Sequence, residues 1–245
     1  MKTLIIKLLH RILGYQRYLK VFSIWKIRTL FMDSRKSDFL YFNNVLPADA
    51  TIAVIGACTG ITTIPLAKKF PKRKIIAFEP EASSFEALNA VVKKFRLNNV
   101  ETFCMAIGNE TGSKEFVLPV VQGVRKQGIA HVVDASITQF NEGILEQVQI
   151  CRVDDLAELQ AIKLTGIKVV AENFEYEIFT GAKEKIKKDQ PLIYCELWDN
   201  EKRQTVHDLI RSYGYEIFYR SGTTLLSYHP SSYSGKNFFF KYVQK

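Results

Sequence analysis

The sequence predicts an α/β fold: a doubly wound, mostly parallel sheet with an antiparallel C-terminal edge strand and an N-terminal helical arm. Short apolar strands alternate with amphipathic helices from about residue 50 onwards. The last two predicted strands are joined by a Ser/Gly-rich connection instead of a helix, which favours an antiparallel pair. With 245 residues, of which 47% are hydrophobic and 24% charged, the chain is long enough for a sizeable core and is neither disordered nor a polar repeat.

The first part of the domain alternates strand and helix. Strands are predicted at 51–55, 74–78 and 100–105, and helices at 61–70 and after the capping box Ser83-Ser84-Phe85-Glu86. The region 109–166 has a weaker pattern, with strands at 115–121 and 146–153 and a glycine-containing loop between them. It holds no motif that we can interpret, and we expect it to be an insertion on the substrate side.

Regular alternation resumes after residue 165. Strands are predicted at 166–170, 191–197, 215–219 and 237–243, with one helix striped by Phe174, Ile178, Ala182 and Ile186 and another striped by Val206, Leu209, Ile210 and Tyr213. This order is typical of a Rossmann-like sheet. The predicted organisation is therefore a basic amphipathic helical arm at 1–45 and a ligand-binding domain at 46–245.

The net charge of +9 is concentrated at the N-terminus. Residues 1–32 contain seven Lys and Arg and no acidic residue, so the rest of the chain is nearly neutral and no nucleic-acid partner is expected. At helical spacing, Ile5, Leu8, Leu9, Ile12 and Leu19 share one side, and Lys7, His10, Arg11 and Arg17 share another. The arm is predicted either to pack on the domain or to lie on an anionic membrane surface or an acidic partner.

Targeting and cysteine patterns predict a cytoplasmic protein, peripheral at the inner membrane surface if the arm binds lipid. Charged residues interrupt any signal-peptide core, and no apolar run is long enough to span a bilayer. The four cysteines include no C-x-x-C pair, which argues against a zinc site and a disulfide scaffold, so no metal is expected.

A ligand site is expected where the first two strands end. Gly56 and Gly60 flank a tight turn that opens a helix, and Glu79 ends the second strand 19 residues further on. In open α/β sheets ligands bind at the carboxyl ends of the strands, and an acid at this place accepts hydrogen bonds from ribose hydroxyls. The pair predicts an adenosine-type ligand, with an exposed Glu79 that merely caps the next helix as the alternative.

Six sequence blocks in this order resemble the FkbM family of S-adenosylmethionine-dependent methyltransferases. They are VIGACTG (54–60), AFEPEASSFEALNAVV (77–92), NNVETFCMAIGN (98–109), RVDDL (152–156), IKVVAENFEYEIFTGA (167–182) and PLIYCEL (191–197). The resemblance implies a class I methyltransferase fold, S-adenosylmethionine as cofactor, and O-methylation of a hydroxyl on a glycan, a lipid-linked sugar or a related small molecule.

Carried over by position, the resemblance also assigns cofactor-binding residues. Gly56, Ala57, Cys58 and Gly60 would hold the amino-acid part, Glu79 the ribose, and Met105 and Ala106 the adenine. The chain departs from the family pattern where Val54 and Val170 replace aspartates, Cys58 replaces asparagine and Asn173 replaces glycine.

Removal of the hydroxyl proton needs a base, and three residues are candidates by location: Glu172, Glu196 and His131. Glu172 follows the fourth strand and Glu196 nearly ends the fifth. Their structural alternatives are a helix start for Glu172, an internal hydrogen bond for Glu196 and an exposed loop position for His131. His207 is predicted at the surface, and Cys58 is expected to pack and not to act as a nucleophile.

Two other functions remain open from the sequence. The degenerate positions would suit a methyltransferase fold that has lost catalysis and acts as a binding or interaction module. An NAD-dependent oxidoreductase shares the glycine turn and the ribose-binding acid, although G-x-G-x-x-G is absent.

Overall fold

The computed structural model describes residues 2–47, 50–69, 71–135 and 137–243. Its helices are α1 Lys2–Leu13, α2 Tyr15–Arg28, α3 Ser37–Val45, α4 Thr63–Lys69, α5 Ala82–Lys94, α6 Ala157–Gln160, α7 Glu175–Thr180, α8 Lys183–Asp189 and α9 Glu201–Ser212, with 3-10 turns η1 Leu30–Met32, η2 Ser34–Lys36, η3 Gln127–Ile129 and η4 Val153–Asp155. Its strands are β1 Ile52–Ile55, β2 Ile75–Phe78, β3 Val100–Phe103, β4 Ala106–Ile107, β5 Gly112–Val121, β6 Val124–Arg125, β7 His131–Val132, β8 Gly143–Cys151, β9 Gly166–Val169, β10 Leu192–Glu196, β11 Tyr215–Ser221, β12 Thr224–Ser227 and β13 Asn237–Tyr242.

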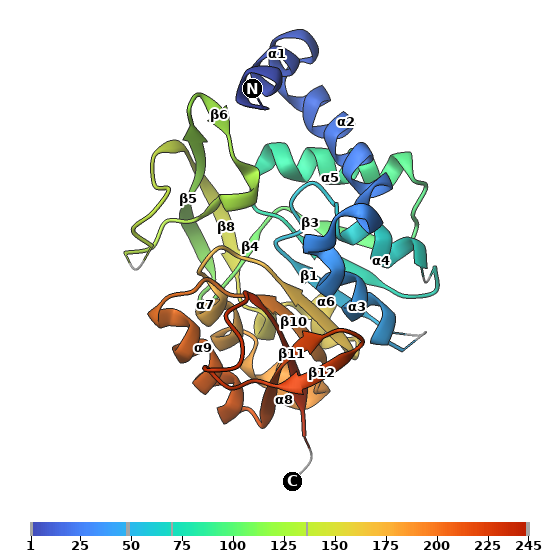
Figure 1. Cartoon of the computed structure of the whole chain (residues 1–245), viewed down its shortest axis with the longest axis vertical. Helices are drawn as coiled ribbons and strands as arrows, with labels where there is room; N and C mark the ends of the chain where they lie inside the picture. Colours follow the sequence, from blue (N-terminus) through green and yellow to red (C-terminus); the bar gives the residue numbers. More distant parts are fainter. Residues whose placement is uncertain (1, 48–49, 70, 136, 244–245) are drawn as a thin grey trace.

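The large sheet has the strand order β12-β11-β13-β10-β9-β1-β2-β3 (Figure 1). Strands β10, β9, β1, β2 and β3 run parallel, which confirms the doubly wound, mostly parallel fold. Ile55 at the end of β1 is in register with Phe78 of β2 and Val169 of β9. The loops after these three strands therefore meet at one edge of the sheet, where such folds bind ligands.

The last strand is antiparallel, as predicted, but it is not at the edge. β13 pairs with β10 on one side and β11 on the other, and β12 forms the edge. Its run Phe238, Phe239 and Phe240 is fully buried on both faces. Three consecutive buried aromatic residues need neighbours on both sides and both faces, so an interior position buries more apolar surface than an edge would.

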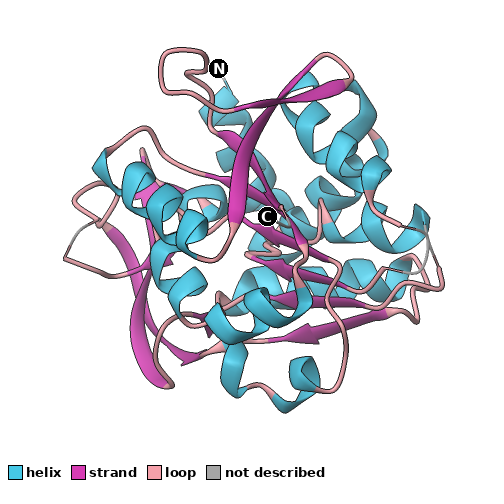
Figure 2. Ribbon diagram, turned by 90° about the horizontal axis from the view of Figure 1, so that it is seen from below, coloured by secondary structure: helices cyan, strands magenta, loops and turns pink. Residues whose placement is uncertain are grey.

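Helices cover both faces of this sheet (Figure 2). Phe39 and Phe42 of α3 and Leu66 of α4 pack with Ile52 and Val54 on one face. On the other face, side chains of α6, α7, α8 and α9 form a second core with the alternate strand residues. Val54, where the family pattern has aspartate, is a fully buried member of the first core.

Most of region 109–166 forms a second, smaller sheet beside the first, on the left of Figure 1. Its strand order is β4-β8-β5-β6, and β7 pairs with β5. The predicted strands at 115–121 and 146–153 correspond to β5 and β8, although β8 ends at Cys151 and Val153 begins η4. This sheet carries η3 toward the strand ends of the large sheet.

Two predicted helix details are wrong. The cap of α5 is Glu81, whose carboxylate accepts hydrogen bonds from the Ser83 and Ser84 amides, and both serines lie within the helix. The helix predicted across 174–186 is two helices, α7 and α8, separated at Gly181. A Cβ on Gly181 would lie 1.8 Å from the Gly108 carbonyl oxygen, so the chain bends where the second sheet approaches it.

The N-terminal arm packs on the domain through α2, as one of the two predictions has it, and leaves the apolar side of α1 exposed. The chain turns at Gly14, whose φ is +71°, so the predicted apolar side is divided between α1 and α2. Leu19 of α2 is buried against Ala87 of α5, and Ile27 packs with Val91. In contrast, α1 leaves its apolar face exposed, with Leu4 76%, Ile5 53%, Leu8 57% and Ile12 68% accessible. No helix among the described residues is long and apolar enough to cross a membrane.

Two buried polar features of the core have consequences for stability. His207 is completely buried, not at the surface as predicted, because its ring packs against Tyr228 and Phe238. Neither of its ring nitrogens has a partner in the described structure, and burial lowers its pKa to about 4. The Lys185 ammonium lies 2.8 Å from the Asp189 carboxylate, and both side chains are buried.

Candidate cofactor and acceptor site

The glycine turn after β1 allows two strand ends to approach each other closely. Gly56 has φ of +74°, and a Cβ there would lie 1.9 Å from the carbonyl oxygen of Val170. Gly60 also has positive φ, and its carbonyl accepts the Ile64 amide as α4 begins. Gly56 is therefore needed for the close packing between the ends of β1 and β9, in addition to the predicted role of both glycines in holding a ligand.

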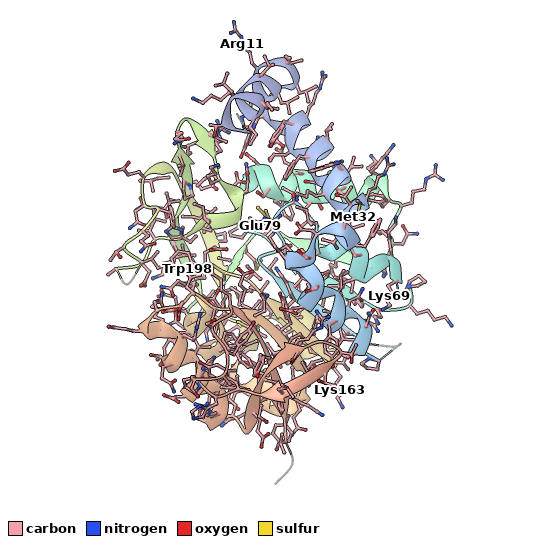
Figure 3. The ribbon with its side chains drawn as sticks, viewed as in Figure 1. Arg11, Met32, Lys69, Glu79, Lys163 and Trp198 are labelled. Atoms are coloured by element: carbon pink, nitrogen blue, oxygen red, sulfur yellow. The ribbon has the colours of Figure 1, made fainter. Side chains whose placement is uncertain are left out.

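Glu79 lies at the centre of this edge of the sheet, and Figure 3 labels it between the arm and the lower half of the molecule. One carboxylate oxygen accepts the Cys58 amide at 2.7 Å and the other accepts the Glu81 amide at 3.0 Å. The side chain is 6% exposed, so Glu79 is not the exposed helix cap of the alternative reading. Burial raises its pKa to about 7.

An apolar cavity opens beside Glu79, which we call the first cavity. Its walls include Ile55, Gly56, Cys58, Phe78, Glu79, Met105, Ala106, Phe116, Gln127, Gly128, Ala130, Val170, Glu172 and Phe174. Five of the seven predicted cofactor residues line it, whereas Ala57 is buried in the core beneath the turn and Gly60 packs on Leu88.

The first cavity fits a nucleoside by the chemistry of its walls. Each Glu79 oxygen has one amide donor and keeps lone pairs for a further donor such as a ribose hydroxyl. The remaining walls are mostly apolar, as adenine requires. The enclosed space is about 100 Å³, below the size of most ligand pockets. Gln127 and Gly128 of the η3 segment form part of the wall that bounds this space.

A buried lysine that the sequence analysis did not single out supports the glycine turn. Lys168 of β9 is 4% exposed, and its ammonium donates a 2.8 Å hydrogen bond to the Gly56 carbonyl. Burial lowers its pKa to about 8. A lysine inside an otherwise apolar strand is a signal that could have identified it. Burial has the opposite effect on the Cys58 thiol, because its charged form is the deprotonated one. It raises the pKa of this thiol to about 12, so Cys58 is neutral and unsuited to nucleophilic attack.

The loop after β9 places two carboxyl groups near the first cavity. Glu172 and Asn173 have φ of 51° and 78°, a conformation that asparagine tolerates where the family pattern has glycine. Glu172 accepts a 2.9 Å hydrogen bond from the Trp198 indole, and burial raises its pKa to about 7. The buried Glu175 accepts the Ala171 amide, which holds the turn, and burial raises its pKa to about 8.

A second cleft continues from the first cavity. It is lined by Gly128, Ile129, Gln139, Phe140, Glu172, Glu196, Trp198, Asp199, Asn200 and Lys236 and encloses about 490 Å³. Glu172 and Gly128 line both spaces, so Glu172 lies where they meet. Phe140 and Trp198 contact edge to face, with ring centroids 6.3 Å apart. Neither aromatic residue was identified from the sequence.

The three candidate bases are placed differently. Glu172 and Glu196 line the second cleft, whereas His131 lines neither space. His131 is 1% exposed, so the exposed-loop alternative for it is wrong. One ring nitrogen contacts the Ile129 carbonyl and the other the Asn141 side chain, both at 2.9 Å. With both nitrogens occupied, this ring joins η3 to the second sheet and has no free nitrogen for a substrate proton.

The chain is similar to known methyltransferases in sequence and in fold. A family model described as the methyltransferase FkbM domain matches residues 55–217. Among solved structures, the methyltransferase FkbM from Methylobacillus flagellatus KT is similar at 12% identity and a TM-score of 0.53, over 81% of this chain and 45% of that one. A SAM-dependent O-methyltransferase from Thermotoga maritima is similar at 11% identity and a TM-score of 0.51, over 90% of this chain and 72% of that one.

The present chain thus spans less than half of the Methylobacillus protein. At these identities the structural likeness concerns the fold. No curated protein matches the sequence.

Proposed function

The chain belongs to the methyltransferase FkbM family, and we propose that it transfers a methyl group from S-adenosylmethionine to a hydroxyl of a glycan, a lipid-linked sugar or a related small molecule. The similarity in fold to a protein named as a SAM-dependent O-methyltransferase supports the cofactor and the oxygen acceptor. In this proposal the first cavity takes the cofactor, the second cleft takes the acceptor, and region 109–166 supplies part of both walls.

The walls of the first cavity support the cofactor assignment. Glu79 would accept the ribose hydroxyls, the backbone of Gly56 and Cys58 would face the amino-acid part, and Met105 with Ala106 would border the adenine. S-adenosylmethionine supplies an electrophilic methyl group on a sulfonium, so the protein has no covalent chemistry of its own to perform. Its residues have to orient the two reactants and manage one proton.

The position of Glu172 carries the acceptor assignment. Its carboxylate lies where the two spaces meet, is oriented by the Trp198 indole, and has a pKa of about 7. A carboxyl group with this pKa is half ionised near neutral pH and can accept the proton of an acceptor hydroxyl. Trp198 and Phe140 offer apolar ring surface to the acceptor, while Glu196 and Asn200 offer hydrogen-bonding groups of the kind that sugar hydroxyls use.

The test measures cofactor binding and turnover separately. Calorimetry with S-adenosylmethionine, S-adenosylhomocysteine and NAD should show binding of the first two only. Release of S-adenosylhomocysteine should then be measured over a panel of glycans. Glu172→Gln should lower kcat by roughly 10²–10⁴ without weakening S-adenosylhomocysteine binding, because it removes the base and keeps the shape.

Each result bears on a different hypothesis. Wild-type protein that ignores both sulfur ligands at millimolar concentration would refute methyl transfer, and binding of NAD instead would favour the oxidoreductase. Binding without turnover on any acceptor would favour the non-catalytic binding module, which the replacement of a family aspartate by Val170 in the cavity wall motivates.

We also propose that α1 lies on an anionic membrane surface. Leu4, Ile5, Leu8 and Ile12 form its exposed apolar face, and Lys7 and Arg11 are exposed beside it. Such a helix buries its apolar side among lipid tails while its cations meet anionic headgroups. Leu8→Glu with Ile12→Glu should abolish sedimentation with phosphatidylglycerol vesicles and leave the protein folded. If this variant sediments like wild type, α1 is not the contact.

A further inference from the structure

A third cleft lies between the N-terminal arm and the segment that precedes β13. It is lined by Phe22, Lys26, Leu30, Asp33, Arg35, Lys36, Ile61, Glu196, Tyr233, Gly235, Lys236 and Asn237, and it encloses about 590 Å³. The arm thus forms one wall of this cleft, with side chains from α2, η1 and η2. In Figure 3, Met32 marks this part of the arm, on the side of Glu79 opposite Trp198 in the view.

The third cleft adjoins the proposed acceptor site. Glu196 and Lys236 line both the second and the third cleft, and Glu172 joins the second cleft to the first cavity. The three spaces therefore adjoin one another along the carboxyl edge of the large sheet. A molecule that reaches Glu172 with one end can extend past Glu196 to the arm.

The third cleft is rich in cations. Four basic residues line it against two acidic ones. Lys26 and Arg35 both reach the Asp33 carboxylate, at 3.4 Å and 2.7 Å. Within the described part of the chain, the ammonium groups of Lys36 and Lys236 have neither a hydrogen bond nor an ion pair, so both are available to a ligand.

The two free lysines act electrostatically on groups near the strand ends. The charge of Lys36 contributes to lowering the pKa of Lys168, and the charge of Lys236 acts on Glu172. Both cations are thus within electrostatic reach of the strand ends, and they flank the route from Glu196 to the arm. Lysine ammonium groups gathered in a cleft are a common way to bind a phosphate group.

We propose that the third cleft binds a phosphate group carried by the acceptor, with Lys36 and Lys236 as its principal ligands. The inference rests on the proposed function and adds the substrate class: a phosphorylated glycan, whose sugar lies in the second cleft near Glu172 and Trp198. The phosphate can belong to a soluble sugar phosphate or to a lipid-linked sugar, because both offer the same tetrahedral anion.

The test compares a cleft variant with a matched surface variant of equal charge. Lys36→Gln with Lys236→Gln removes the two free cations. Lys163→Gln with Lys188→Gln removes two exposed lysines outside the cleft, and Lys163 lies toward the lower end of the molecule (Figure 3). The probes are inorganic pyrophosphate, glucose 1-phosphate, farnesyl phosphate and glucose, titrated calorimetrically into full-length protein at a fixed ionic strength, because exposed charges are screened by salt.

Wild type should bind the phosphorylated probes more tightly than glucose. The affinity of the cleft variant for the phosphorylated probes should fall roughly tenfold or more, because it lacks the charge-assisted hydrogen bonds from the two lysines to the phosphate. The surface variant should bind these probes like wild type. Preference for glucose 1-phosphate would indicate a soluble acceptor, and preference for farnesyl phosphate a lipid-linked one. Equal losses in both variants, or no binding of any phosphorylated probe, would overturn the proposal.

S-adenosylhomocysteine binding to the same proteins separates this failure from failure of the proposed function. If that ligand binds wild type and a phosphorylated glycan is methylated equally well by wild type and cleft variant, methyl transfer stands and the phosphate site is wrong. If that ligand does not bind wild type, the methyltransferase proposal fails whatever the phosphate titration shows.

Discussion

The protonation of Glu79 should control cofactor binding near neutral pH. The buried carboxyl has a pKa of about 7, and only its ionised form can accept hydrogen bonds from both ribose hydroxyls. At pH 8 about ten in eleven molecules carry the carboxylate, and at pH 6 about one in eleven. The affinity for S-adenosylhomocysteine should therefore fall about tenfold between pH 8 and pH 6, which corresponds to about 1.4 kcal/mol.

Glu79→Gln tests whether this residue is the cause. The amide cannot ionise and offers one acceptor instead of two, so it should weaken binding at pH 8 by about 1–3 kcal/mol and remove the pH dependence. Calorimetric titrations at pH 6, 7 and 8 measure both effects. Any protonation of the ligand itself affects wild type and variant equally. The difference in affinity between wild type and Glu79→Gln therefore reports the protonation of the Glu79 side chain.

Glu172→Gln is the matched control, because Glu172 also borders the first cavity and has a pKa of about 7. It should keep the pH dependence of binding. If Glu79→Gln retains the tenfold change, or if Glu172→Gln abolishes it, then Glu79 is not the ribose ligand. A wild-type affinity that stays constant from pH 6 to pH 8 would refute the reasoning as well.

Three further predictions concern stability. Gly56→Ala should lower the free energy of unfolding by roughly 2–4 kcal/mol, as measured by urea denaturation, because its Cβ would strike the Val170 carbonyl in a left-handed conformation. Lys185→Met should cost about 3–5 kcal/mol by the same measurement, because it leaves the Asp189 carboxylate buried without its cation. His207→Phe should raise stability by about 1 kcal/mol at pH 7, because it removes two buried nitrogens that have no partner.

The His207 prediction also has a pH signature with a definite sign. The folded pKa of about 4 lies below the unfolded value of 6.5, so between these values the unfolded chain binds the proton more readily. Wild-type stability should therefore fall as pH drops from 6.5 to 4, by up to about 3 kcal/mol from this ring. The difference between wild type and His207→Phe should grow over that window, and a constant difference would contradict the burial of a neutral histidine.

Controls exist for the other two substitutions. Gly14 has φ of +71°, and no atom lies within 4 Å of the point that a Cβ would occupy, so Gly14→Ala isolates the conformational cost from the clash. An equal loss at both glycines would mean that the Val170 contact is unimportant. Asp189→Asn added to Lys185→Met should recover part of the lost stability. The asparagine side-chain oxygen still accepts a hydrogen bond from the Leu164 backbone N–H, and the side chain carries no buried charge. No recovery would contradict the charge argument.

The alternation of strands and helices in the large sheet, apart from β12 and the division between α7 and α8, was predictable from the sequence, as were the glycine turn and the place of Glu79. These features depend on local periodicity and on the rule that ligands meet the carboxyl ends of parallel strands, and both can be evaluated within short stretches of chain. Element boundaries agree to within a few residues for the strands of the large sheet. The sequence resemblance added the family, which the match over residues 55–217 confirms.

The internal place of β13 and the break between α7 and α8 required the packed structure. An antiparallel strand can pair at an edge or between two others with the same sequence pattern, and burial of Phe238–Phe240 on both sides decides between them. The helix break depends on Gly108, which approaches Gly181 from a distant part of the chain. Local propensity carries no information about such neighbours.

By itself, the sequence determined the fold class and the concentration of positive charge in residues 1–32, and it predicted a cofactor site at the ends of the first two strands. Only the tertiary structure decided that Lys168 holds the Gly56 carbonyl, that Trp198 orients Glu172, and that His131 is buried with each ring nitrogen facing an oxygen atom. It also placed the basic arm beside the C-terminal region, so that Lys36 and Lys236 line one cleft. Apart from those of His131, these contacts join residues far apart in the chain, and their chemistry exists only once the sheet has brought those residues together.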